Sequence, residues 1–112
     1  MTTYNKGDVV LVNFVYSEEK GTKLRPAIII NTDSYYCSRG EVIVAAITSK
    51  VGRLFAGDFL IAGWKEAGLL YPSVLTGILR TIKQSMINRK LGVMPPNDIA
   101  SIEIALREAL GL

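Results

Sequence analysis

The residues best suited to chemistry in this sequence are cations and hydroxyls near the ends of apolar runs. Arg25 precedes the apolar run that begins at Ala27, and Thr48, Ser49 and Lys50 close the next apolar run along the chain. A planar guanidinium presents paired donors that match phosphate oxygens, and a hydroxyl adds one more donor. If the two runs are antiparallel neighbouring strands, these side chains meet at one rim of a sheet. There they could hold a phosphodiester whose charge grows in the transition state.

Composition excludes several other kinds of catalytic site. The sequence has no His and a single Cys, Cys37, so neither a Ser-His-Asp nor a Cys-His arrangement can be built. No phosphate-binding loop of the GxxxxGK[ST] or GxGxxG type occurs. Acidic residues are scattered singly apart from Glu18 and Glu19, and Cys37 has no His or second Cys with which to bind zinc. We therefore expect neither a metal nor a cofactor.

The distribution of charge points to an anionic partner. The formal net charge is +3, but the last fifteen residues hold three acids and one base. Residues 1–97 therefore carry twelve bases and seven acids, a net charge of +5. A polyanion is a reasonable partner for this part of the fold. The alternative is a solvated basic surface that maintains solubility, and charge alone does not separate the two.

Apolar runs rich in β-branched and aromatic residues predict a chain made mostly of short strands. The predicted strands are residues 8–14, 27–31, 41–48, 58–61, 73–79 and 80–85. Residues 16–23, 31–40 and 49–57 are polar or charged and are predicted as connections. Gly77 is expected to form a bulge between the last two strands. The residues around Trp64 are expected to form one helical turn that ends at Gly68.

A single long helix is predicted at the C-terminal end of the sequence. Pro95 and Pro96 stop the preceding structure, Asn97 is the expected N-cap, and Asp98 complements the helix dipole. The apolar residues of one helix face are Ile99, Ile102, Leu106 and Leu110. Short strands followed by one helix predict a mainly β fold: a small, strongly curved barrel with a C-terminal α-helix.

The sequence shows no sign of membrane insertion or secretion. No apolar run approaches the roughly 18–20 residues needed to cross a bilayer, and the first ten residues lack a signal-peptide pattern. Neither a linker nor an internal repeat is visible. We therefore expect a cytoplasmic protein with one domain, residues 1–112.

Five short motifs, taken in order, resemble the landmarks of the MazF/PemK toxin family. They are GDVV at 7–10, LRP at 24–26 before a strand ending in NTD at 31–33, IVAAIT at 43–48, PSV at 72–74 and LRTI at 79–82. The resemblance covers nearly the whole chain. It implies an SH3-like barrel of the CcdB/PemK type, a homodimer, and the toxin of a type II toxin–antitoxin pair. It also implies a metal-independent, sequence-selective endoribonuclease that cleaves single-stranded RNA, chiefly mRNA, and that a small acidic antitoxin neutralises.

The resemblance also implies which residues are catalytic. The family's catalytic Arg falls on Arg25 and its catalytic Thr falls on Thr48. In the implied reaction the ribose 2′-hydroxyl attacks the adjacent phosphorus and yields a 2′,3′-cyclic phosphate and a free 5′-hydroxyl, so DNA cannot serve as substrate.

Two departures from the family pattern affect this assignment. Lys83 stands where many relatives have Asp, which leaves the proton acceptor open, because arginine with a pKa above about 12 is a poor general base. A phosphate oxygen or Glu19 is the candidate acceptor. In addition, residues 21–24 read GTKL in place of the usual paired glycines, so the loop over the site is expected to differ in shape.

Several basic and aromatic residues are candidates for binding the RNA chain. The candidate polar contacts are Lys20, Lys23, Ser49, Lys50, Arg53 and Arg80. The aromatic residues that could stack on bases are Tyr16, Tyr35, Tyr36 and Phe55. We expect at least one of the adjacent pair Tyr35 and Tyr36 to cover the core instead.

Two other functions remain open at this point. One is a non-catalytic CcdB-like barrel that acts as a protein-binding toxin or a regulatory partner, and the other is a toxin that has lost its activity and only binds its antitoxin. Lys83 in place of an acid favours a non-catalytic protein, whereas the presence of both Arg25 and Thr48 opposes it.

Overall fold

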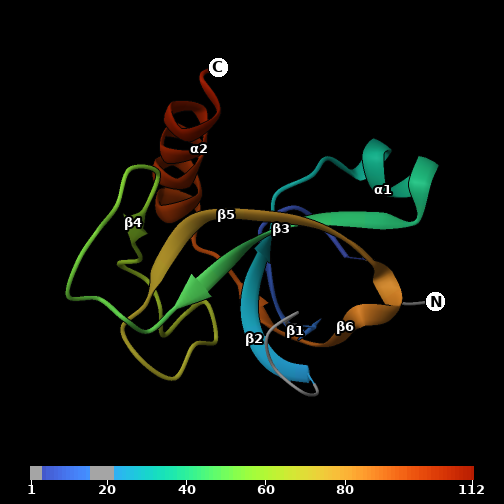
Figure 1. Cartoon of the computed structure of the whole chain (residues 1–112), viewed down its shortest axis with the longest axis horizontal. Coiled ribbons are helices and arrows are strands. Elements are labelled where there is room, and N and C mark those ends of the chain that lie inside the picture. Colours follow the sequence, from blue (N-terminus) through green and yellow to red (C-terminus); the bar gives the residue numbers. More distant parts are fainter. Residues whose placement is uncertain (1–3, 16–21) are drawn as a thin grey trace.

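One curved antiparallel sheet and a C-terminal helix make up most of the fold (Figure 1). The computed structural model describes residues 4–15 and 22–112. The six strands are β1 (Asp8–Val15), β2 (Thr22–Ile29), β3 (Glu41–Thr48), β4 (Phe59–Leu60), β5 (Val74–Lys83) and β6 (Ile87–Val93), in the order β4-β5-β3-β2-β1-β6. The helices are α1 (Asp33–Arg39) and α2 (Pro96–Leu110), and a 3-10 turn, η1 (Gln84–Met86), joins β5 to β6.

The central strands are apolar on both faces because each face of the sheet is covered by a core. Successive side chains of a strand point to opposite faces. Accordingly Val42 and Val44 of β3 pack in one cluster, with residues of β1, β2, β5 and β6. Ala45 and Ile47 pack in a second cluster, to which α2 and the segment 61–69 also contribute. The uninterrupted apolar runs in the sequence thus reflect burial on two sides.

α2 seals the second core and is fixed at its first turn. It begins at Pro96 after Pro95, a position that suits proline because the missing N–H would have no partner in the helix. The prediction that Asn97 is the N-cap is wrong, since the cap position is Pro95 and no side chain caps the helix. Ile102 is buried, as its position on the apolar face predicted, whereas Leu110 is 53% exposed.

Asp98 does more than complement the helix dipole. Its side chain is buried, and its two oxygens accept hydrogen bonds from the backbone N–H groups of Ala62 and Gly63 at 3.0 and 2.9 Å. The carboxylate therefore fastens the connection after β4 to the start of α2. Charge-assisted hydrogen bonds of this kind are among the stronger ones in proteins.

β2 begins earlier than the sequence predicted. Residues 27–29 of the predicted strand 27–31 lie within β2, which starts at Thr22, ends at Ile29 and pairs with β1 from Val15↔Thr22 onward. Arg25 thus lies within a strand, opposite Val12, and not before one. Pairing with β1 outweighs the charged, turn-like composition of the segment that precedes Arg25. The predicted strands 8–14 and 41–48 are confirmed by β1 and β3.

The predicted connection 31–40 contains a helix that the sequence analysis missed. α1 is capped by Thr32, whose hydroxyl accepts a hydrogen bond from Tyr35 N at 3.3 Å. Gly40 ends the helix with a φ of 66°, a left-handed conformation that suits glycine. A Thr before an acidic residue and a Gly seven residues later are the signals that could have revealed α1.

The second half of the sheet also differs from the prediction. Most of the predicted strands 73–79 and 80–85 forms the single strand β5, whereas residues 84 and 85 belong to η1. The pairing of β5 with β3 is irregular around Gly77, as expected of a bulge. β6 was not predicted because exposed Arg89 and Lys90 interrupt its apolar pattern. The expected helical turn near Trp64 consists of consecutive hydrogen-bonded turns that end at Gly68.

The mainly β fold class with a C-terminal helix is confirmed. Hydrogen bonds do not close the described sheet into a barrel, because β4 and β6 are its two ends. Figure 1 shows β5 arching across the sheet, with β4 and α2 on one side and α1 on the other. None of the described helices is both long enough and apolar enough to span a bilayer.

Candidate functional site

The structure brings Arg25 and Thr48 into one pocket. β2 and β3 pair antiparallel with Ala27 opposite Ala46, so Arg25, two residues before Ala27, and Thr48, two residues after Ala46, share an edge and a face of the sheet. The pocket has a volume of about 210 Å³. Its lining residues are Arg25, Ala46, Ile47, Thr48, Thr76, Ile78 and Arg80. Three neighbouring strands, β2, β3 and β5, therefore build the pocket.

The hydroxyl of Thr48 is oriented by the backbone that follows it. Lys50 N donates a hydrogen bond to Thr48 Oγ1 at 3.2 Å. Because this bond uses the hydroxyl oxygen as an acceptor, the hydroxyl proton can be donated to a ligand. Thr48 is half-buried at the end of β3, so its side chain is positioned by the sheet while one side stays accessible.

A bulge in β5 shapes the wall opposite Thr48. Ala45 pairs with Leu79 whereas Ile47 pairs with Leu75, so residues 76–78 of β5 face Ala46 alone. Thr76 Oγ1 donates to the Ala46 carbonyl at 2.8 Å, and Ile78 N donates to Thr76 Oγ1 at 3.2 Å. The hydroxyl of Thr76 thus holds the bulge closed, and Ile78 is presented to the pocket with 59% of its surface exposed.

The pocket is positively charged. Arg25 and Arg80 both line it, and Arg80 lies opposite Val44, on the same face of the sheet as Thr48. None of the described lining residues is acidic, and among the described residues no carboxylate pairs with Arg25. Two guanidinium groups around a hydroxyl donor favour an anion with several oxygens, such as a phosphodiester. A metal ion is not favoured by this charge, and no metal-binding group of three or more His, Cys, Asp or Glu side chains occurs in the described part of the chain.

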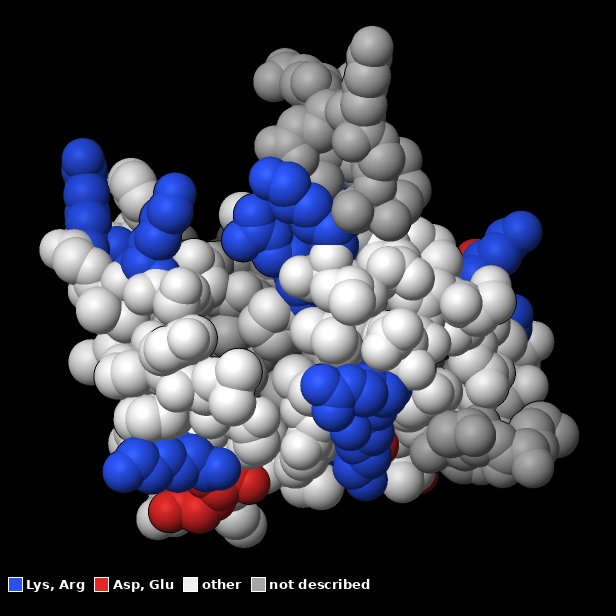
Figure 2. Space-filling view, turned by 90° about the horizontal axis from the view of Figure 1, so that it is seen from below, with Lys and Arg blue, Asp and Glu red and all other residues white. Residues whose placement is uncertain are grey.

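A larger groove continues from this pocket. It has a volume of about 1100 Å³ and shares Thr48, Thr76 and Ile78 with the smaller pocket. Lys50 and Arg53 line it together with residues of β5 and the last turns of α2. Figure 2 shows Lys and Arg side chains spaced over one face of the molecule, where acidic side chains are few.

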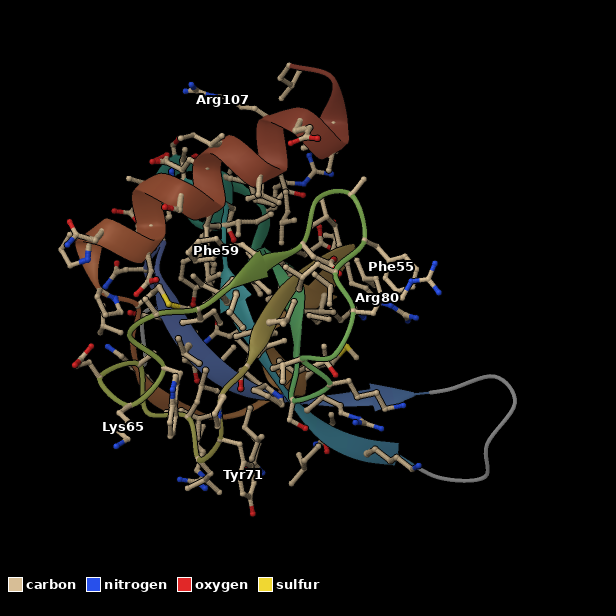
Figure 3. All side chains as sticks on the ribbon, turned by 90° about the vertical axis from the view of Figure 1, so that its left-hand side faces the viewer. Phe55, Phe59, Lys65, Tyr71, Arg80 and Arg107 are labelled. Atoms are coloured by element: carbon tan, nitrogen blue, oxygen red, sulfur yellow. The ribbon has the colours of Figure 1, made fainter. Side chains whose placement is uncertain are left out.

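An aromatic side chain is held over this groove. Phe55 is 63% exposed, and the guanidinium carbon of Arg53 lies 4.8 Å from its ring centroid. Phe55 N donates to Asp58 Oδ2 at 2.9 Å and Asp58 N donates to the Phe55 carbonyl at 3.0 Å, which closes a turn. In Figure 3 Phe55 and Arg80 point to the same side of the molecule. The turn therefore places the aromatic ring on the side of the basic pocket.

Small residues let this turn pack against α2 and the bulge. Gly57 has a φ of 87°, and a Cβ built on it would lie 2.9 Å from the Cβ of Ala109 and 3.8 Å from the Cα of Gly77. Only glycine combines this conformation with so close an approach. The groove thus has a wall made by the C-terminal part of α2, where Glu108 also lines it.

The other predicted RNA contacts fall in different places. Lys23 is exposed on β2, two residues before Arg25, and does not line the described pocket around Arg25 and Thr48. Ser49 does not line the pocket around Arg25 and Thr48. It lines a separate pocket, described below. Three further candidates, Tyr16, Glu19 and Lys20, lie outside the described residues.

Tyr35 and Tyr36 are far from the pocket. Both belong to α1, which lies just before the first residue of β3. Thr48 is the last residue of β3, and a strand of this length spans about 20 Å. Tyr36 packs against the first core cluster and its hydroxyl donates to Gln84 Oε1 at 2.5 Å. The expectation that one of the pair covers the core is confirmed.

Sequence reasoning found Arg80 but missed the rest of the contribution of β5 to the site. Thr76 and Ile78 line both the pocket and the groove, yet neither was a candidate. The expected bulge at Gly77 was the available signal, because a bulge redirects the side chains on either side of it.

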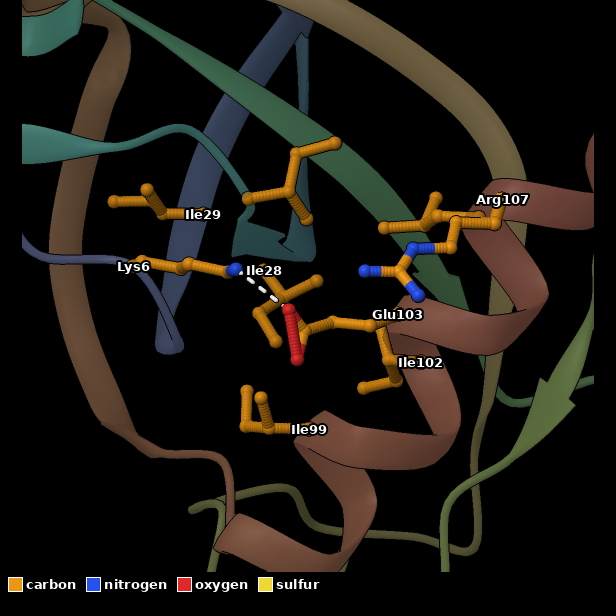
Figure 4. Close-up of a pocket in the computed structure, with 9 residues that line it drawn as sticks. Lys6, Ile28, Ile29, Ile99, Ile102, Glu103 and Arg107 are labelled. Carbon is orange, nitrogen blue, oxygen red and sulfur yellow. Dashed lines mark hydrogen bonds and ion pairs between the residues drawn. The ribbon is translucent and has the colours of Figure 1, made fainter. Parts of the chain in front are cut away.

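A third, smaller pocket lies between α2 and the end of β2 (Figure 4). Its volume is about 150 Å³, and its walls are largely isoleucine side chains. At its rim Lys6 Nζ lies 2.9 Å from Glu103 Oε2. Lys6 lowers the pKa of Glu103 below 4.5, chiefly through the hydrogen bond that it donates and secondly through its positive charge. This ion pair tethers the segment before β1 to α2 and has no part in the basic pocket.

Comparison with known proteins identifies the family to which this chain is similar. A family model described as PemK-like, MazF-like toxin of type II toxin–antitoxin system matches residues 5–110. No curated protein matches this chain in sequence.

Solved structures share the fold at low sequence identity. A Mycobacterium tuberculosis toxin, MazF-mt6, is 23% identical with a TM-score of 0.75, over 94% of this chain and 97% of that one. MazF from Deinococcus radiodurans is 19% identical with a TM-score of 0.78, over 100% of both chains. An endoribonuclease from a mycobacterial species, in complex with its cognate antitoxin, is 19% identical with a TM-score of 0.80, over 98% of this chain and 97% of that one. Because the family model spans almost all of the described fold, this chain belongs to the PemK-like, MazF-like toxins of type II toxin–antitoxin systems.

Proposed function

We propose that this chain, as a single MazF/PemK-like domain over residues 1–112, is the toxin of a type II toxin–antitoxin pair and a sequence-selective endoribonuclease that cleaves single-stranded RNA, chiefly mRNA. One observation carries the proposal: Arg25, Thr48 and Arg80 line a single pocket on the surface of the sheet. Family membership and the endoribonuclease among the structural neighbours support it.

In the proposed reaction the 2′-hydroxyl of the substrate attacks the adjacent phosphorus and releases the 5′-oxygen, leaving a 2′,3′-cyclic phosphate. Arg25 is the principal catalytic residue and, with Arg80, neutralises the non-bridging oxygens as their charge grows. Thr48 donates its hydroxyl proton to one of these oxygens, because Lys50 N already occupies its oxygen as an acceptor. One such donor typically accelerates a reaction by about 10²- to 10³-fold.

The proton of the 2′-hydroxyl requires an acceptor other than a carboxylate of the described pocket, since none of its described lining residues is acidic. We propose a phosphate oxygen or Glu19 in this role. Because the reaction uses the substrate's own nucleophile and fixed cations, it requires neither a metal nor another cofactor.

The RNA chain is proposed to follow the groove that continues from the pocket. Lys50 and Arg53 would contact phosphates, and Phe55 would stack on a base, an interaction worth about 1–3 kcal/mol. Lys20, Lys23 and Tyr16 are proposed as further contacts.

We also propose that the protein is a cytoplasmic homodimer whose partner is an acidic antitoxin. The structural neighbours include an endoribonuclease in complex with its cognate antitoxin and a MazE–MazF complex. An acidic segment would be attracted to the basic pocket around Arg25 and Arg80 and would block RNA from it.

The proposal is tested by incubating purified protein with a long RNA of mixed sequence in EDTA and mapping the cut ends and their chemistry. We expect sequence-selective cuts that end in 2′,3′-cyclic phosphate, and their loss in Arg25→Ala. Arg39→Ala is the matched control, because Arg39 is also exposed but lies beside Glu41 at the far end of β3. Intact RNA after incubation with folded wild-type protein would refute the proposal.

A second candidate function is a non-catalytic toxin or regulatory partner that binds a protein target. The lack of an acidic residue among the described lining of the pocket favours it, since that lining supplies no general base. If the double variant Arg25→Ala, Thr48→Ala still arrests growth when expressed, this second function replaces the first.

A further inference from the structure

A fourth pocket lies on the opposite face of the sheet from Arg25 and Thr48. Pro26, which follows Arg25 within β2, lines it, and neighbouring residues of a strand face opposite sides. Ser49, which follows Thr48 just after β3 ends, lines it as well. Its volume is about 410 Å³. The lining residues are Leu11, Pro26, Ser49, Gly68, Leu69, Leu70, Tyr71, Ser73, Arg89 and Leu91. The chain at residues 48–50 is thus a lip with the basic pocket on one side and this pocket on the other.

The pocket combines an aromatic ring, a guanidinium and an apolar floor. Tyr71 is 64% exposed and Arg89 is exposed on β6, opposite Leu11 of β1. Within the described residues no carboxylate pairs with Arg89, whereas its neighbour Lys90 pairs with Asp8 at 3.2 Å. Figure 3 shows Tyr71 pointing outward at a different edge of the molecule from Phe55 and Arg80.

The backbone under this pocket is rigidly packed. Gly68 has a φ of 86°, and a Cβ on it would lie 2.2 Å from the Leu91 carbonyl oxygen, so the segment that carries Tyr71 lies directly on β6. Ser73 is buried, and its hydroxyl donates to the Tyr71 carbonyl at 2.7 Å. The backbone that carries Tyr71 and Arg89 is therefore well packed, which lowers the backbone entropy lost when a ligand binds.

We propose that this pocket is a second subsite for single-stranded RNA, in which Tyr71 stacks on a base and Arg89 contacts a phosphate. The inference rests on the proposed ribonuclease function, because it extends the RNA chain from Thr48 over the lip at Ser49. Single-stranded RNA is bound by aromatic platforms next to cations, which is the combination present here. RNA is favoured over an acidic peptide because Thr48 of the basic pocket and Ser49 of this pocket are adjacent in the chain, so one RNA strand that crosses the lip would reach both.

The experiment measures binding by fluorescence anisotropy with labelled 2′-O-methyl RNA, which has no free nucleophile and stays uncut. Mixed-sequence oligonucleotides of about 20 nucleotides are compared with oligonucleotides of about 4 nucleotides, too short to occupy both subsites. Tyr71→Ala is expected to weaken binding of the long RNA by about 5- to 150-fold, the equivalent of about 1–3 kcal/mol for one stacked base. Arg89→Ala is expected to reduce the slope of log affinity against log salt by about 0.7.

Matched controls come from α1, where Tyr35 and Arg39 are the same residue types as Tyr71 and Arg89. The Arg39 guanidinium lies 5.3 Å from the Tyr35 ring centroid, so this pair also combines an aromatic ring with a cation. Tyr35→Ala and Arg39→Ala are expected to leave the binding of long RNA unchanged. Tyr71→Phe keeps the ring and is expected to bind as the wild type does, which excludes misfolding as the cause of a loss.

The two proposals fail in distinguishable ways. If the wild type cuts RNA but Tyr71→Ala and Arg89→Ala bind long RNA as tightly as the wild type, the second subsite is refuted and the ribonuclease stands. If the wild type cuts no RNA yet both variants weaken RNA binding, the ribonuclease is refuted and the subsite stands. Weakened binding of an acidic peptide, with RNA binding unchanged, would assign the pocket to a protein and overturn the inference.

Discussion

Replacing Thr48 with Val tests whether its hydroxyl takes part in the proposed cleavage. Valine keeps the branched shape of threonine, so the end of β3 is preserved while the donor is lost. The only described hydrogen bond that disappears is the one from Lys50 N at 3.2 Å, and because Lys50 is exposed, water can replace it. We therefore expect a change in unfolding free energy within about 0.5 kcal/mol.

The effect on catalysis should be far larger. If the Thr48 hydroxyl donates to a phosphate oxygen in the transition state, its loss should lower kcat by about 10²- to 10³-fold, or about 2.7–4 kcal/mol, with little change in KM. The assay is single-turnover cleavage of a fluorescent RNA that contains a mapped cut site. Thr48→Ser should recover most of the rate, and Thr81→Val, on the same sheet but outside the pocket lining, should cleave normally. A Thr48→Val protein that cleaves within about threefold of the wild type would show that the hydroxyl is not needed.

Three further predictions concern stability. Thr76→Val leaves the half-buried Ala46 carbonyl without its donor and should cost about 1–2 kcal/mol, seen as a thermal midpoint lowered by about 4 °C per kcal/mol, whereas Thr76→Ser should be near wild type. Asp98→Ala removes the acceptor of two backbone N–H groups and should cost about 2–4 kcal/mol in urea unfolding; a loss below about 0.5 kcal/mol would contradict the proposed anchoring. Lys6→Met should destabilise the protein at pH 7 but not well below pH 4.5. The pKa of Glu103 is lower in the folded state than in the unfolded state, so the ion pair stabilises the fold at pH values above the unfolded-state pKa. This stabilisation is lost as the pH falls through the folded-state pKa. Equal urea midpoints for the two proteins at pH 7 would rule out a stabilising ion pair.

The sequence was informative where side-chain pattern alone decides the structure. β1 and β3 are nearly uninterrupted apolar runs and α2 has apolar residues at a helical period, and these three elements were predicted within a few residues. The pairing of β2 with β3 was assumed from their order, and it was sufficient to expect Arg25 and Thr48 on one rim.

The remainder depends on contacts between distant segments. Ile78 reads as an ordinary strand residue, and it faces the pocket because a bulge opposite Ala46 changes the register of β5. Arg89 lies in a strand that exists because β1 supplies a partner, although its own composition opposes a strand. Neither fact can be derived from local propensity, since both arise from pairing across long stretches of the chain.

The contact between α2 and the loop at Gly57 has a practical consequence for protein engineering. The final turns of the helix are a structural support for the groove, so a fusion partner or truncation introduced there would alter the shape of the groove as well as the stability of the core. Purification tags and fluorescent reporters attached after residue 112 could therefore reduce cleavage without touching any proposed catalytic residue.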